Sequence, residues 1–159
     1  MGGKSMLRTL IVGLGNPILS DDGIGLRVAQ AVRECIGETG LEYLEASQGG
    51  LGLAEQLDGY ERVILIDAIQ TRGGLPGAIY RLTLDDLPTC NADGAHDASL
   101  KNALQLVRQQ GGQVPDSGAV SVVAIEAVNL LEFGERLTPQ VERAIPAAVH
   151  AVLATLNES

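Results

Sequence analysis

The aliphatic run at residues 62–66, Arg-Val-Ile-Leu-Ile, constrains the fold of this chain most strongly. Four consecutive β-branched or leucine side chains predict a strand that is buried on both of its faces. Strands of this kind occur almost only in parallel sheets that are covered by helices on both sides. A chain built around such a strand is therefore expected to be an α/β protein.

Other short apolar runs alternate with segments of helical periodicity. Further strands are predicted at residues 9–13, 42–46, 78–84 and 119–125. A helix after the first strand carries an apolar face made of Gly25, Val28, Ala29, Val32, Cys35 and Ile36. Later helices are predicted from the Gly49-Gly50 pair through Leu57, at 98–110, and from Thr138-Pro139 onward with a kink at Pro146.

This alternation predicts a three-layer α/β/α sandwich with a mostly parallel twisted sheet of about five strands. The length of 159 residues fits a single domain spanning residues 1–159. Residues 1–6 are expected to lie outside the ordered fold, because Met6 is a second candidate start. In such sheets the functional site forms beyond the carboxyl ends of the strands.

Composition limits the partners. The chain has 20 acidic and 11 basic residues, a net charge of −9, and only 3% aromatic residues, so nucleic acid is not an expected partner. No apolar run approaches the roughly 20 residues of a membrane span, so no membrane association is expected. The two cysteines have no CxxC spacing, which favours a location in the cytoplasm, and Cys35 is expected in the core. Nothing in the sequence demands more than a monomer.

The turn after the first strand does not match a dinucleotide-binding site. The third glycine of a GxGxxG fingerprint would fall on residue 18, which is Ile18, and Asp21 and Asp22 would repel a phosphate at the helix start. Ser20 is a natural N-cap, and one of the two aspartates is expected only to stabilise the helix dipole. Glycines at 23 and 25 indicate that something approaches the backbone closely.

Asp67 and His96 are the other candidate site residues. Asp67 ends the most apolar strand, where a carboxylate must be paired, hydrogen-bonded or metal-bound. A structural role, in which Asp67 caps the next loop through backbone N–H groups, is an equal alternative to a functional one. His96 lies in a long predicted loop at 85–97, whereas the other histidine, His150, is expected to be structural or exposed. If the first and third strands are neighbours, Asp22, Asp67 and His96 would converge into a site for a divalent metal with open positions.

The chain resembles the hydrogenase maturation proteases over nearly its whole length. The resemblance rests on LIVGLGNPILSDDGIG at 10–25, SQGG at 47–50, ILIDAI at 64–69, GAHD at 94–97, EAV at 126–128 and LTP at 137–139. It implies an α/β/α endopeptidase that trims the C-terminus of the large-subunit precursor of nickel–iron hydrogenases. It also implies that Asp22, Asp67 and His96 are the metal-binding and catalytic residues, and that they sense nickel supplied by the substrate.

Two positions depart from the family pattern. The first ligand is Glu in some members, and Asp22 is one methylene shorter. Asp often precedes the Gly-Gly pair in the family, whereas this chain has Ser47-Gln48 there. The Gly49-Gly50 pair offers backbone N–H groups that would hold the cleaved segment.

Two other functions compete with the protease interpretation. Peptidyl-tRNA hydrolases also open with a VGLGNP turn, but they need a nearby histidine, and this chain has none before His96. A non-catalytic, metal-sensing chaperone of hydrogenase assembly is the second alternative. It stays open because the chain has no GxSxG or HExxH motif and no nucleophile identifies itself.

Overall fold

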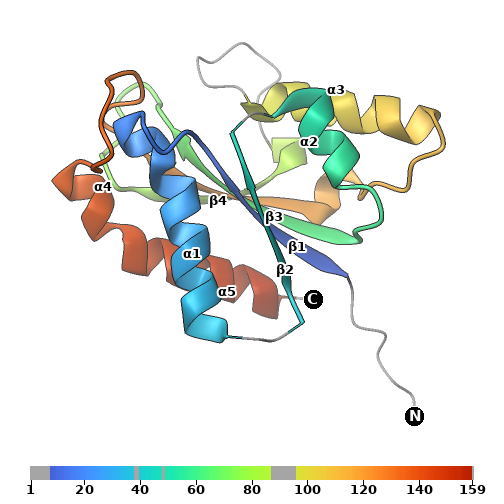
Figure 1. The fold of residues 1–159 in the computed structure, drawn as a ribbon, viewed down its shortest axis with the longest axis horizontal. Helices are drawn as coiled ribbons and strands as arrows, with labels where there is room; N and C mark the ends of the chain where they lie inside the picture. Colours follow the sequence, from blue (N-terminus) through green and yellow to red (C-terminus); the bar gives the residue numbers. More distant parts are fainter. Residues whose placement is uncertain (1–7, 38–39, 48, 87–95, 159) are drawn as a thin grey trace.

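A five-stranded sheet forms the middle of the protein in the computed structural model, which describes residues 8–37, 40–47, 49–86 and 96–158 (Figure 1). The strands are β1 (Thr9–Leu14), β2 (Glu42–Ala46), β3 (Arg62–Ile69), β4 (Ile79–Thr83) and β5 (Val120–Glu126). Their order is β2-β1-β3-β5-β4, and only β4 runs antiparallel to its neighbour. The predicted fold class, a mostly parallel sheet of about five strands between helices, is confirmed.

Helices cover both faces of the sheet (Figure 1). One face carries α1 (Ile24–Ile36), α4 (Pro139–Arg143) and α5 (Ile145–Asn157), and the other carries α2 (Gly50–Gln56) and α3 (His96–Gln109). Short 3-10 helices stand at Ser20–Gly23 (η1), Leu84–Asp86 (η2) and Ser117–Ala119 (η3). Among the described residues, no helix is long and apolar enough to cross a bilayer.

The central strand β3 contributes side chains to both cores. Ile64 and Ile66 pack with α1 and α5, while Val63 and Leu65 pack with α2 and α3. Alternation along the strand therefore fills both layers from one aliphatic run, as the sequence predicts for a strand buried on both faces. This burial fixes β3 in the middle of the sheet, between β1 and β5.

Two helix predictions need correction. Cys35 was expected in the core but is exposed, because it lies in the last turn of α1, where its neighbour Ile36 takes the position against the core. Pro146 does not kink one long helix. The chain instead forms two helices, α4 and α5, and Pro146 lies in the first turn of the second, where its missing N–H is tolerated.

Cys90 and the predicted extension at residues 1–6 lie outside the described residues.

Candidate active site

Asp67 is a buried carboxylate near the carboxyl end of β3. Asp67 is only 2% exposed, and its Oδ1 accepts a hydrogen bond from the backbone N–H of Ala68 at 2.8 Å. The strand does not end here as predicted but continues to Ile69. Because Leu65 and Ile69 pack on the α2 and α3 side, alternation places Asp67 on that side too.

Asp22 lies in η1, the turn that joins β1 to α1. Its carboxylate is partly buried and accepts a hydrogen bond from the backbone N–H of Asn16 at 2.8 Å. The strand β1 lies directly beside β3, and η1 itself contacts β3. The first and third strands are therefore neighbours, which is the condition under which Asp22 and Asp67 are predicted to lie at one edge of the sheet.

His96 is the first residue of α3 rather than a loop residue as predicted. The helix starts two residues before the expected position 98, so the backbone of His96 is held by the first turn. Its side chain lies outside the described part of the structure. Among the side chains that are described, no three His, Cys, Asp or Glu form a metal-binding group. The joining of His96 to Asp22 and Asp67 thus stays a prediction.

Asp21 has a role that the sequence did not reveal. Its side chain is fully buried and accepts hydrogen bonds from the backbone N–H groups of Val128, Asn129 and Thr138 at 2.9, 3.0 and 2.7 Å. The Thr138 hydroxyl donates to the same carboxylate. Asp21 therefore fixes the loop at 127–138, between β5 and α4, and does much more than stabilise a helix dipole.

Ser20 serves the same loop and is not an N-cap. Its hydroxyl donates to the backbone carbonyl of Arg136 at 3.0 Å, and its N–H donates to the carbonyl of Gly134 at 2.7 Å. A φ of 49° at Ser20 lies in the left-handed region that few non-glycine residues adopt. These two hydrogen bonds hold the backbone in that strained conformation.

The glycines of this turn are explained by internal packing. A Cβ at Gly25 would lie 2.2 Å from the carbonyl oxygen of Ile66 and 2.5 Å from that of Leu14. A Cβ at Gly15 would lie 1.9 Å from the carbonyl oxygen of Asp22. The expected close approach at residue 25 is therefore the contact of α1 with β1 and β3, and a bound molecule is not needed to explain it.

A third buried carboxylate, Glu126, ends β5. It pairs with Ile69, two residues beyond Asp67 on the neighbouring strand β3. It is 1% exposed and accepts hydrogen bonds from the N–H and hydroxyl of Thr71, at 2.7 and 2.6 Å, and from the Tyr80 hydroxyl at 2.9 Å. Glu126 thereby fixes the start of the β3–β4 connection beside the candidate site. Glu126 is not among the predicted site residues, although it follows a run of buried aliphatic side chains as Asp67 does.

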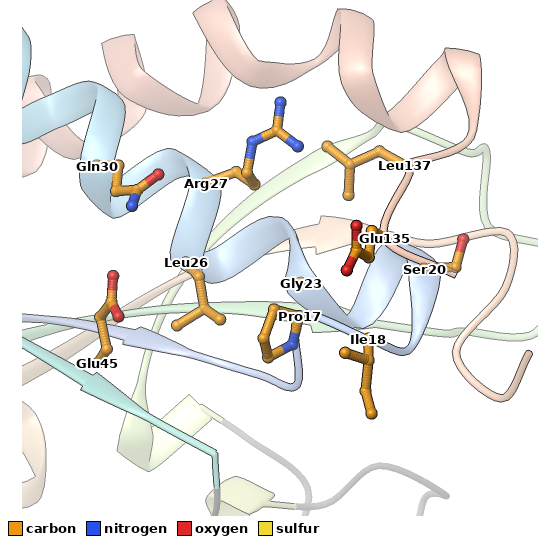
Figure 2. Close-up of a pocket in the computed structure, with 10 residues that line it drawn as sticks. All are labelled: Pro17, Ile18, Ser20, Gly23, Leu26, Arg27, Gln30, Glu45, Glu135 and Leu137. Atoms are coloured by element: carbon orange, nitrogen blue, oxygen red, sulfur yellow. The ribbon is translucent and has the colours of Figure 1, made fainter. Parts of the chain in front are cut away.

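A cavity of about 360 Å³ lies on the α1 side of η1 (Figure 2). Its lining includes Pro17, Leu26 and Leu137, with Glu45 and Glu135 toward opposite ends of the view. Of the candidate site residues whose side chains the structure describes, neither Asp22 nor Asp67 lines it. The cavity lies on the α1 side of the sheet and Asp67 on the α2 and α3 side, and Ser20 and Gly23 of η1 form part of the cavity lining.

Comparison with known proteins decides the family. The family model HycI, described as hydrogenase maturation protease, matches residues 8–155. The chain belongs to the hydrogenase maturation protease family. The hydrogenase 2 maturation protease of Escherichia coli is 31% identical over 156 residues, which cover 96% of this chain and 93% of that protein.

Solved structures agree with this membership. The hydrogenase maturating endopeptidase HybD from E. coli superposes with a TM-score of 0.78 at 28% identity, over 94% of this chain and 92% of that chain. The hydrogenase 2 maturation peptidase from Thaumarchaeota archaeon SCGC_AB-539-E09 superposes with a TM-score of 0.68 at 26% identity, over 94% of this chain and 98% of that chain. The chain is therefore a hydrogenase maturation endopeptidase, and the resemblance seen in its motifs is confirmed in preference to peptidyl-tRNA hydrolase.

Proposed function

We propose that this hydrogenase maturation protease removes a C-terminal peptide from the nickel-loaded precursor of a nickel–iron hydrogenase large subunit. The observation that carries the proposal is the family match over residues 8–155, which includes both carboxylates at the carboxyl edge of the sheet. Asp67 supports it further, because an aspartate that is 2% exposed on a central strand is unusual unless it has a specific task.

Asp22, Asp67 and His96 are the residues we assign to metal binding and catalysis. Adjacent strands β1 and β3 bring the first two to one edge, and α3, which begins at His96, covers the face on which Asp67 lies. Leu100 and Leu104 of this helix pack into the core on this face.

We assign nickel to the substrate. Two carboxylates and an imidazole are compatible with Ni(II) and leave positions for ligands from the precursor. Held by these residues and by the precursor, the metal would supply Lewis-acid chemistry at the scissile peptide bond. The role of Asp22, Asp67 and His96 is to recognise that the precursor is loaded and to place its peptide bond beside the metal.

The remaining expectations follow from charge and composition. A net charge of −9 favours neither nucleic acid nor an anionic membrane surface. We accordingly propose that the protein works in the cytoplasm as a monomer, with the precursor as its partner.

Intact mass spectrometry of the precursor tests this function. A candidate large-subunit precursor, with and without nickel loaded, is incubated with the protein and weighed. The proposal predicts one C-terminal mass loss that depends on nickel. Binding without any mass loss would contradict it and favour the chaperone alternative. Equal cleavage of both precursor forms would refute the nickel requirement.

A further inference from the structure

The 127–138 loop exposes two large apolar side chains beside η1. Leu131 is 86% exposed and Phe133 is 84% exposed, and Val128 and Ile18 nearby are 42% and 48% exposed. Phe133 is the only phenylalanine of the chain. Large apolar side chains that gather at the surface are typical of a protein interaction site.

The backbone of this loop is held in place from two sides. The Asn129 side chain accepts hydrogen bonds from the N–H groups of Leu131 and Glu132, both at 3.1 Å, and donates to the Glu132 carboxylate at 3.0 Å. Asp21 fixes the two ends of the loop from within the core. A partner that binds Leu131 and Phe133 therefore does not have to order the loop first, which favours affinity.

Two cavities meet at this loop. One, of about 470 Å³, is lined by Ser20, Asn129, Glu132, Phe133, Gly134, Glu135 and Arg136. The other is the cavity of about 360 Å³ in Figure 2, which shares Ser20 and Glu135 with the first. The loop and its cavities thus make one continuous surface, which reaches η1 and hence the turn that carries Asp22.

The charges of this surface indicate a basic partner segment. Glu45, Glu132 and Glu135 line the cavities, against two arginines, Arg27 and Arg136. In the part of the chain that the structure describes, none of these five side chains forms an ion pair. The acidic excess lies on a molecule of net charge −9, which repels an acidic segment and attracts a basic one.

We propose that the 127–138 loop and its two cavities are the docking surface for the hydrogenase precursor. Apolar side chains of the precursor cover Leu131 and Phe133, and a lysine or arginine beside them enters between Glu132 and Glu135. This inference rests on the proposed function. It adds the place at which the substrate is held, a surface that includes Ser20 of η1.

A double variant, Leu131→Ser with Phe133→Ser, tests the apolar contact. The precursor's Kd by calorimetry and its KM for cleavage are expected to rise about tenfold or more, with kcat at saturation unchanged, because exposed anchors act through binding. The matched control is Leu106→Ser on α3, which is 49% exposed and lies outside this surface. An unchanged Kd and KM in the double variant would overturn the proposal.

Charge reversal provides a second and independent test. Glu132→Lys and Glu135→Lys are expected to weaken binding by several-fold each, most strongly at low salt. Glu34→Lys, exposed at the far end of α1, is the control and should leave the Kd unchanged. Tighter binding by the two loop variants would show that the partner segment is acidic and would overturn the proposal.

Two further outcomes separate this inference from the proposed function. If the wild-type protein binds the precursor and the loop variants do not, while no mass is lost, the cleavage function fails and the docking surface stands. If sedimentation shows a wild-type dimer that the double variant dissociates, with KM unchanged, the surface joins two copies of this chain and the proposal is wrong.

Discussion

Buried carboxylates have different tasks in this protein according to their partners. Asp21 and Glu126 each accept several short hydrogen bonds from backbone N–H groups and hydroxyls, and they fix the connections that follow β5 and β3. Asp22 accepts one backbone hydrogen bond and is partly exposed. The acids that are surrounded by donors therefore serve the structure, and Asp22 is the acid of this turn that we propose for chemistry.

Replacement of Asp21 by Asn tests this division. The amide keeps one acceptor oxygen and presents an NH₂ group to N–H donors, so at least one buried donor loses its partner. We expect Asp21→Asn to lower the free energy of unfolding by about 1–3 kcal/mol in urea titrations. The same substitution at Asp22 should change it by much less. Equal stability losses at the two positions would contradict the assignment.

The choice between Asp21 and Asp22 shows what local sequence can and cannot reveal. The neighbouring pair is visible in the sequence, and one of the two was rightly expected to be structural. The partners that make Asp21 structural, Val128 and Thr138, lie more than a hundred residues away along the chain. No periodicity or spacing encodes such a contact, so its strength was underestimated as a helix-dipole effect.

At the scale of elements, the contact of α1 with the sheet determines where η1 can lie. Gly25 lets the helix approach the carbonyl oxygens of Leu14 and Ile66, and Gly13 on β1 lies under the same helix. The start of α1 is thereby pressed onto β1 and β3, and η1 is held at the carboxyl edge. A side chain at residue 25 would have to move the helix as a body, because its neighbours are backbone atoms.

Two glycine-to-alanine variants measure this contact. Gly25→Ala should lower the free energy of unfolding by about 1–3 kcal/mol or more through overpacking. Gly52→Ala, in a helix with nothing within 4 Å of the added Cβ, should instead stabilise by up to about 1 kcal/mol. Thermal unfolding of both variants decides the point, and a Gly25→Ala protein as stable as the wild type would refute the close packing.

Elements were predicted well where local pattern determines them. The aliphatic run at 62–66 and the strand at 42–46 are both found, since period-two and buried patterns are short-range signals. The break between α4 and α5 was not predicted, because a proline in a helical pattern can bend a helix or start a new one. Val141 of α4 and Ala148 of α5 both pack in the same core, a long-range contact that the local pattern does not encode.

At the scale of the whole molecule, the edge of the sheet opposite the candidate site is closed by a hydrogen-bonded cluster of its own. At the amino edge, Arg8 donates to Glu42 at 3.0 and 3.3 Å, Tyr60 donates to the same carboxylate at 3.0 Å, and the guanidinium lies over the Tyr60 ring. This cluster joins the beginnings of β1, β2 and β3. The candidate site lies at the other end of the same strands.

A Glu42→Gln variant should separate the two edges. Hydrogen bonds from Arg8 and then Tyr60 hold the pKa of Glu42 below its usual value. The stabilisation is therefore present above the unfolded pKa of about 4.3 and disappears as the pH falls through the lowered folded pKa. We expect a lower Tm than wild type at pH 7, a difference that vanishes in strong acid, and an unchanged processing rate. A reduced rate at equal stability would contradict the separation.

The measurement that most directly tests the account compares cleavage by single variants of the three assigned residues. Asp22→Asn, Asp67→Asn and His96→Ala are each incubated with nickel-loaded precursor, and the precursor is weighed by intact mass spectrometry, with circular dichroism of each variant as the check on folding. Leu106→Ala on α3 is the matched control. We predict folded proteins that leave the precursor uncut in all three cases, beside normal cleavage by the control. A folded His96→Ala or Asp67→Asn variant that cleaves at the wild-type rate would show that the site has been wrongly assigned.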